Sequence, residues 1–208
     1  MNRSILFTCM IILSQISLAQ KSVVGEYQLT GIHDMAAGLR FTENGRFDFY
    51  YIYGASDRNA TGTYTVIGDT IKLKSDKVPG KDFTVKHQSS KKGFCKVVVK
   101  EENKILLNNI VVVAFVGDKQ HTYISGPDGI IETDLKQCDS LYLQHQMFPD
   151  ILSMIKDKDN TNNYFEVTLN PSLQQVSFKG IDFYIQGDTL TCHYNYFMPF
   201  EDITFVKE

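Results

Sequence analysis

The chain has 208 residues, of which 43% are hydrophobic, and its formal net charge is −3. This length provides enough apolar side chains for one large domain or two modest ones. The 21 basic residues are scattered along the chain and are outnumbered by 24 acidic ones, whereas nucleic-acid-binding proteins usually concentrate their basic residues in a patch. The composition therefore gives no basis for a nucleic-acid partner.

The first 19 residues have the pattern of a secretory signal peptide. Arg3 supplies the positive charge, an apolar segment follows at 5–16, and residues 17–19 (SLA) form a small-x-small cleavage site. The apolar segment is too short for a transmembrane helix. We expect residues 1–19 to be cleaved and the protein to be periplasmic or secreted, with no stable transmembrane segment.

A first β-hairpin is predicted around the loop 43–45 (Glu-Asn-Gly), because glycine at the third position of the loop accepts a left-handed conformation. A three-residue loop places Phe41 opposite Phe47 and, on the other face, Arg40 opposite Asp48. A two-residue turn would instead place Phe41 opposite Asp48. Since the buried face selects the register of a strand pair, we expect the three-residue loop.

The tripeptide Gly-Asp-Thr occurs twice, each time between two segments of alternating hydrophobicity. The first occurrence predicts a hairpin with a type II′ turn that pairs Val66 with Ile71. The second predicts the same turn and pairs Ile185 with Leu190. The two ends of the chain therefore share a pattern that the middle lacks.

This pattern predicts an all-β protein in two parts. Residues 20–88 and 172–208 are expected to form one discontinuous antiparallel barrel, and residues 93–171 a β-sandwich inserted between its strands. The polar segment QSSKKG reads as the linker between them. Such insertions are tolerated where the ends of a surface loop lie close together.

Three segments of the outer parts carry a resemblance to the lipocalin-like small barrels of secreted bacterial proteins: Gly25–Tyr27, Leu39–Phe47 and Gly62–Leu73. The family pattern is Gly-x-Tyr/Trp near the start, then L-F-x-x-N-G-x-F, then GTY-x-x-x-GDTI-x-L. The resemblance covers about half of the mature chain. It implies a barrel fold and leaves the function open.

The middle of the chain resembles the carboxypeptidase-regulatory-like (prealbumin or transthyretin-like) β-sandwich of many secreted Gram-negative bacterial proteins. The matching segments are Cys95–Lys100, Ile110–Val116, the stretch from Thr122 through Asp128-Gly129, and Val167–Leu169. Gly126-Pro127 stands where the family often has Thr-Asp, and Ile130 where it usually has an aromatic residue. The family implies no catalytic residues.

Three cysteines follow the predicted signal peptide: Cys95, Cys138 and Cys192. Their spacing matches no zinc pattern. In an oxidising compartment one pair could join and leave one thiol over. Buried free thiols and a single bridge both fit the sequence, which does not say which cysteines would pair.

No two histidines have HxH, HxxxH or HExxH spacing. Nitrogen and sulfur ligands that would suit copper lie closest together in the sequence at two places: His145 with Met147, and Cys192-His193 with Met198. Residues 157–162 (DKDNTN) resemble a calcium loop but lack its glycine and its final glutamate. We expect surface or capping histidines and a solvated loop, and therefore predict no metal and no cofactor.

No Gly-x-Ser-x-Gly elbow or glycine-rich phosphate loop is present, so we predict that the protein is not an enzyme. The strongest functional signal is the aromatic segment 47–53, whose alternate side chains share one face. Core packing explains such a face without any function. A small barrel can also hold one ligand in its mouth, where tyrosine offers a ring face and a hydroxyl.

We therefore take Phe49, Tyr51 and Tyr53 as candidate ligand-binding residues. They predict a non-enzymatic binding protein for a small apolar or glycan ligand. The alternative is a structural or protein-interaction module with filled cores, which would offer its sheet edges to a protein partner. An open pocket lined by Tyr51 and Tyr53 favours the first hypothesis, and a filled barrel favours the second.

Overall fold

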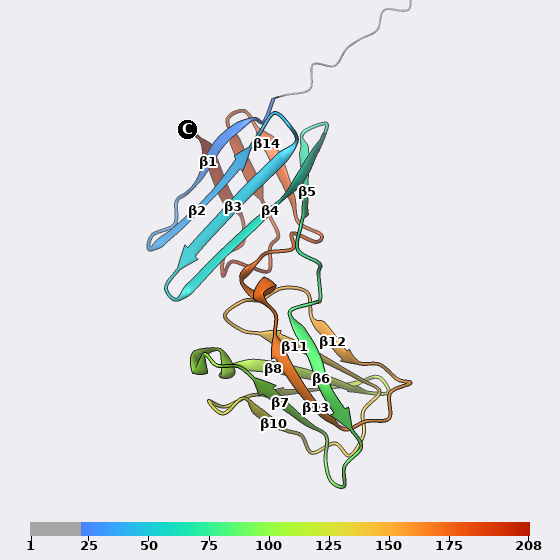
Figure 1. Cartoon of the computed structure of the whole chain (residues 1–208). Helices are drawn as coiled ribbons and strands as arrows, with labels where there is room; N and C mark the ends of the chain where they lie inside the picture. Colours follow the sequence, from blue (N-terminus) through green and yellow to red (C-terminus); the bar gives the residue numbers. More distant parts are fainter. Residues whose placement is uncertain (1–21) are drawn as a thin grey trace, which may run out of the picture.

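The computed structural model describes residues 22–208 as an all-β chain in two parts, a barrel and a pair of smaller sheets (Figure 1). Two short 3₁₀ helices complete it, η1 (Lys104–Leu107) and η2 (Pro171–Gln174). The predicted signal peptide, residues 1–19, lies outside the described residues. From residue 22 onward, no helix is long and apolar enough to cross a membrane.

Eight antiparallel strands form a closed barrel. They are β1 (Gly25–Thr30), β2 (Met35–Phe41), β3 (Arg46–Tyr53), β4 (Ser56–Ile67), β5 (Thr70–Ser75), β14 (Asp182–Gln186), β15 (Thr189–Cys192) and β16 (Ile203–Lys207). Their order around the barrel follows their order in the chain, and β16 closes the barrel against β1. The predicted discontinuous barrel is confirmed, because β5 and β14 are neighbours in the barrel although a long insertion separates them in the chain.

Three hairpins have the strand registers that the residues at their turns predict. In the β2–β3 hairpin Phe41 pairs with Phe47 and Arg40 with Asp48, and Gly45 has the positive φ of 75° that the three-residue loop requires. In the two Gly-Asp-Thr hairpins Val66 pairs with Ile71 and Ile185 pairs with Leu190. These three local predictions are confirmed.

Between β5 and β14 the chain forms two sheets of four strands each. Sheet B has the order β10 (Ile130–Glu132), β7 (Lys96–Lys100), β13 (Tyr164–Leu169), β6 (Phe83–Ser89), and sheet C has the order β12 (Ser153–Lys156), β11 (Ser140–His145), β8 (Ile110–Val116), β9 (Lys119–Ile124). The sheets pack around one shared core, to which sheet B contributes Val97 and Phe165 and sheet C contributes Val112 and Leu143.

The insertion begins one strand earlier than predicted. Residues 83–87 were expected in the barrel part, but β6 pairs with β13 in sheet B, with Phe83 opposite Leu169. The alternation of this segment identifies a strand and says nothing about its partner, which lies far along the chain. The chain therefore leaves the barrel after β5, and it returns through η2 after β13.

Aromatic rings fill the interior of the barrel. Phe178, in the segment that returns from the inserted sheets, is 1% exposed, and its ring centroid lies 5.0 Å from that of Phe49 and 5.7 Å from that of Phe47. Phe197, from the β15–β16 connection, lies 5.2 Å from Phe178. The φ of Phe178 is +53°, which is uncommon for a bulky residue, and its side chain is buried in the barrel core.

Candidate ligand-binding cleft

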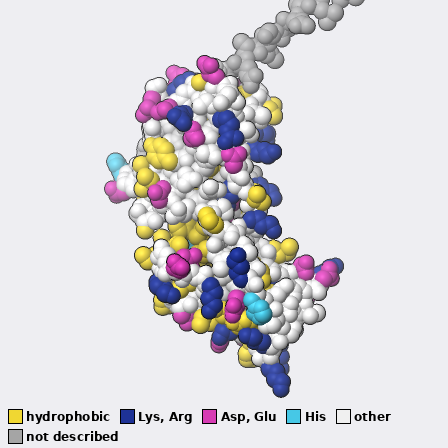
Figure 2. Space-filling model, viewed as in Figure 1, with side chains coloured by type: hydrophobic (Ala, Val, Ile, Leu, Met, Phe, Trp, Pro, Cys, Tyr) yellow, Lys and Arg dark blue, Asp and Glu magenta, His cyan; other side chains and the backbone are white. Residues whose placement is uncertain are grey.

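A cleft of about 550 Å³ opens where one end of the barrel meets the inserted sheets. It is lined by the end of β3 with the β3–β4 turn, by the β11–β12 connection, and by the β15–β16 connection. Figure 2 shows hydrophobic side chains gathered on this face where the two parts of the molecule meet. We call it the aromatic cleft, because Tyr51, Tyr53, Tyr196 and Phe197 all line it.

Two tyrosines near the end of β3 form the floor and the rim of the cleft. Tyr51 is 2% exposed and its ring lies 6.5 Å from that of Phe197, so it forms the floor. Tyr53 is 41% exposed and its ring lies 6.3 Å from that of Phe200, so it forms the rim. Burial raises the pKa of Tyr51 and the neighbouring Arg58 only partly offsets this, so its hydroxyl stays protonated at neutral pH.

Direct hydrogen bonds hold the two sides of the cleft together. Ser56 Oγ in β4 donates to the carbonyl oxygen of Met147 at 3.1 Å. Arg58 Nη1, two residues further along β4, donates to the carbonyl oxygen of Pro149 at 2.7 Å. Both acceptors lie in the β11–β12 connection of sheet C, so the cleft is preformed by contacts between the barrel and the insertion.

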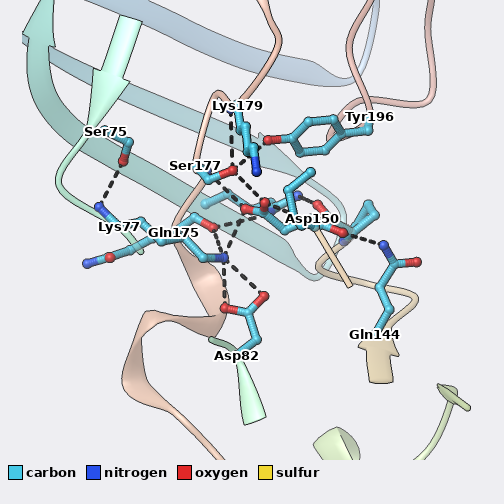
Figure 3. A network of polar contacts seen from close by, with 12 residues as sticks. Ser75, Lys77, Asp82, Gln144, Asp150, Gln175, Ser177, Lys179 and Tyr196 are labelled. Carbon is cyan, nitrogen blue, oxygen red and sulfur yellow. Dashed lines mark hydrogen bonds and ion pairs between the residues drawn. The ribbon is translucent and has the colours of Figure 1, made fainter. Parts of the chain in front are cut away.

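A buried network of charges lies beneath the cleft (Figure 3). Lys77 Nζ lies 2.9 Å from Asp150 Oδ2 and 2.8 Å from Asp82 Oδ1. Arg58 Nη2 lies 3.8 Å from Asp150 Oδ2, and the carbonyl oxygen of Gln175 accepts hydrogen bonds from both Arg58 and Lys77. Two cations and two anions therefore compensate each other out of contact with water, which is the condition under which buried charges are tolerated.

The surroundings shift the pKa values of the two carboxyl groups of this network in opposite directions. Burial raises the pKa of Asp82 to about 6, because the hydrogen bond and charge of Lys77 offset the lost hydration only in part. Burial also acts on Asp150, but Lys77 and the Ser177 hydroxyl outweigh it and lower the pKa of Asp150. Ser177 gives Asp150 two hydrogen bonds, from its N–H at 2.9 Å and from its Oγ at 2.6 Å. Each charged group faces another group of the network, so we assign the network to holding the two parts together.

A larger groove of about 790 Å³ lies on another side of the same junction. It is lined by β5, the β5–β6 connection and the residues before β14. Lys72 on its wall is already paired with Asp182 at 3.0 Å, and the one ring that lines it, Phe178, is buried in the barrel core. The charged residues Lys72, Lys74, Asp76, Lys77, Lys179 and Asp182 make up much of the lining of this groove, and its one aromatic ring is buried, so we regard the aromatic cleft, with its exposed ring at Tyr53, as the better ligand site.

The structure separates the three candidate residues named from the sequence. Tyr51 and Tyr53 line the aromatic cleft, whereas Phe49 lies deeper, at 3% exposure, with its ring packed against Phe178. Sequence reasoning missed Met147 and Tyr196, which complete the cleft. Both lie in irregular connections where no periodicity marks a functional face.

The residues considered as metal ligands are engaged in other contacts. His145 is buried, its Nδ1 accepts a hydrogen bond from the N–H of Met147 at 3.2 Å, and its Nε2 lies 3.2 Å from the carbonyl oxygen of Leu106. In the loop that resembles a calcium site, Asp157 Oδ1 accepts backbone N–H groups from Asp159 and Asn160. Within residues 22–208, no group of three or more His, Cys, Asp or Glu side chains could hold a metal ion.

In comparisons with known proteins, no family model matches this chain and no curated protein matches it. The architecture is that of an eight-stranded antiparallel barrel with an inserted pair of sheets.

Proposed function

We propose that this protein is a non-enzymatic binding protein that holds a small apolar or glycan ligand in the aromatic cleft. One observation carries the proposal: Phe178 and Phe197 occupy the barrel interior, while an open cleft of about 550 Å³ lies across the barrel end with Tyr53 at its rim. The ligand therefore lies across the end of the barrel instead of inside it. The volume is in the range of small-molecule sites, which is roughly 300–1,000 Å³.

The lining of the cleft defines the chemistry of the ligand. Flat rings at Tyr51, Tyr53 and Phe197 suit a ligand with an apolar face, either a hydrophobic molecule or the face of a sugar ring. The Gln146 side chain and the tyrosine hydroxyls supply hydrogen-bonding groups at the same place. A ligand with one apolar face and a few polar substituents matches both.

A pair of matched variants tests this assignment. Tyr53→Ala removes the rim of the cleft, and Tyr184→Ala removes a tyrosine of almost equal exposure (40% against 41%) on the outside of β14. Binding would be measured with the fluorescent apolar probe anilinonaphthalene sulfonate and with an array of glycans. We expect Tyr53→Ala to weaken binding about tenfold while Tyr184→Ala binds like the wild type. Equal binding by all three proteins would refute the site.

The second candidate function is a protein-interaction module, and one feature favours it. The edge strand β9 pairs only with β8 among the described strands, and its Ile124 is 54% exposed. An unpaired strand edge can accept an additional strand from a partner. Ile124→Lys would abolish capture of such a partner and leave binding of the apolar probe unchanged, which separates the two functions.

We also propose that the barrel is related to the lipocalin-like barrels, that the inserted sheets are related to the carboxypeptidase-regulatory-like sandwiches, and that the protein is periplasmic or secreted. The up-and-down strand order and the core shared by sheets B and C support the two relationships. The basic, apolar and small-residue pattern of the first 19 residues supports export. Amino-terminal sequencing of the mature protein tests the last point, and we expect it to begin at Gln20.

A further inference from the structure

Five side chains with a hydroxyl or an amide line the aromatic cleft, and two of them are already used within the protein. Ser56 Oγ donates to the carbonyl oxygen of Met147 at 3.1 Å. The Tyr196 hydroxyl lies 2.7 Å from Ser177 Oγ, with which it shares a hydrogen bond (Figure 3). Among residues 22–208, the hydroxyls of the two tyrosines of β3 and the side-chain amide of Gln146 have no hydrogen-bond partner.

Tyr51 is the deepest of these three groups. It is 2% exposed, whereas Tyr53 is 41% exposed and Gln146 is exposed at the surface. Arg58 lies opposite Tyr51 in the β3–β4 pair, so the two side chains share the inner face of the barrel. The guanidinium of Arg58 offers only donors, and its Nε is itself buried without a partner. No acceptor within the described residues therefore pairs with the Tyr51 hydroxyl.

An unpaired hydroxyl at the floor of the cleft restricts which ligands can bind. Water in an open cleft satisfies such a group. A ligand that covers the hydroxyl must replace that water with an acceptor atom, because a buried hydroxyl left unpaired opposes binding. A site with a fixed polar group of this kind therefore rejects ligands that lack the matching group. A wholly apolar ligand would cover Tyr51 without pairing it.

We propose, on the basis of the ligand-binding function assigned above, that Tyr51 makes the aromatic cleft specific for a glycan, with a sugar oxygen accepting a hydrogen bond from the Tyr51 hydroxyl. The face of the sugar ring lies against the aromatic rings of the cleft, and other sugar hydroxyls reach Gln146 and the Tyr53 hydroxyl at the rim. A sugar carries hydroxyls around an apolar ring face, so it matches both the free polar groups and the rings. A hydrocarbon matches the rings alone.

Tyr51→Phe tests the hydroxyl by itself, because it removes one oxygen atom and keeps the ring that packs against Phe197. The hydroxyl has no partner to lose, so the variant should keep the urea midpoint of the wild type. The matched control is Tyr50→Phe, on the outer face of β3, whose hydroxyl donates to Gln28 Oε1. The two probes are a panel of methyl glycosides, titrated by calorimetry, and naphthalene, which has no hydrogen-bonding atom and is followed by its fluorescence.

We expect Tyr51→Phe to bind the glycoside about tenfold more weakly than the wild type does and to bind naphthalene equally well. Tyr50→Phe should match the wild type with both probes. Equal glycoside binding by Tyr51→Phe and the wild type would overturn the inference and leave the cleft as a ligand site. A wild type that binds naphthalene and no glycoside would have the same meaning. Unchanged binding by Tyr53→Ala would instead refute the site, and with it both the proposed function and this inference.

Deoxy analogues of the glycoside that binds give a second readout. Replacing one sugar hydroxyl by hydrogen should weaken binding to the wild type about tenfold, and the same replacement should have no effect on binding to Tyr51→Phe. An equal loss in both proteins would show that this hydroxyl contacts a different group. That result, or a wild type that binds every deoxy analogue as tightly as the parent glycoside, would overturn the role of Tyr51.

Discussion

Lys77 Nζ lies 2.9 Å from Asp150 Oδ2, and neither side chain is accessible to solvent. Lys77 belongs to the connection by which the chain leaves the barrel, and Asp150 belongs to the β11–β12 connection of sheet C. This ion pair therefore joins the barrel to the inserted sheets directly beneath the aromatic cleft. It fixes the connection that carries Met147 and Pro149, which form one wall of the cleft.

Removing one charge of this pair should destabilise the protein strongly. Asp150→Asn keeps the shape of the side chain but leaves Lys77 and Arg58 with only Asp82 as a charged partner. We expect the free energy of unfolding to fall by about 3–5 kcal/mol, as measured by urea denaturation. The control is Asp48→Asn, which breaks the exposed pair with Arg40 and should leave the urea midpoint unchanged. A small loss in Asp150→Asn would show that the junction does not depend on this network.

The stability of the protein should depend on the ionisation of Asp82. Its pKa is raised from the ordinary value of 3.8 to about 6, so the folded state binds this proton more tightly than the unfolded state does. The resulting stabilisation is complete below about pH 4 and is lost as the pH rises through about 6. Carboxylates with a lowered pKa, among them Asp150, have the opposite effect: their contribution to stability is lost as the pH falls.

The comparison with Asp82→Asn isolates this contribution. Between pH 4 and pH 7, the free energy of unfolding of the wild type minus that of Asp82→Asn should decrease by roughly 3 kcal/mol at most. Urea denaturation at a series of pH values measures it. A difference that increases with pH would mean that Lys77 stabilises the ionised carboxylate more than burial opposes it.

Phe178 fills the barrel, and its removal should open a cavity. Its ring packs against those of Phe47, Phe49 and Phe197. We expect Phe178→Ala to lose about 3–5 kcal/mol of stability. The variant should also bind a benzene-sized apolar molecule inside the barrel, as dry engineered cavities do. Thermal unfolding with and without benzene measures both effects, and a variant of wild-type stability would show that the ring is not a core element.

Gly62 in β4 lies where neighbouring strands approach so closely that there is no room for a side chain. A Cβ at this position would lie 2.1 Å from the carbonyl oxygen of Lys74 and 2.6 Å from Cε1 of Phe47. Gly62→Ala should therefore destabilise the barrel by roughly 3 kcal/mol through overpacking. Gly126→Ala is the control, because its nearest neighbour would be Asp128 Oδ1 at 3.7 Å. Equal urea midpoints for the two variants would contradict the close approach.

Local turn chemistry explains why the hairpins were predictable. Glycine at the left-handed position of the 43–45 loop and the buried pair Phe41–Phe47 leave one register for the first hairpin. The strand β6 was assigned to the wrong part for the converse reason. Its alternation is local, but its partner β13 is chosen by the shared core of the inserted sheets, which no short-range pattern encodes.

The candidate site was predictable only where it lies on a strand. Alternation along β3 predicts that Tyr51 and Tyr53 share a face, and the same alternation in β4 predicts that Arg58 lies on the buried face with Ala60. Met147 and Tyr196 come from irregular connections, and the two parts of the chain that bring them together meet only in the folded protein. No sequence pattern specifies such a meeting.

Native mass spectrometry of the mature protein, recovered from the cells that make it, tests the ligand-binding cleft most directly. We expect the wild type and Tyr184→Ala to carry an additional small molecule of one constant mass, and the occupancy to fall about tenfold in Tyr53→Ala. An apo mass alone in the wild type, or full occupancy in Tyr53→Ala, would contradict the account.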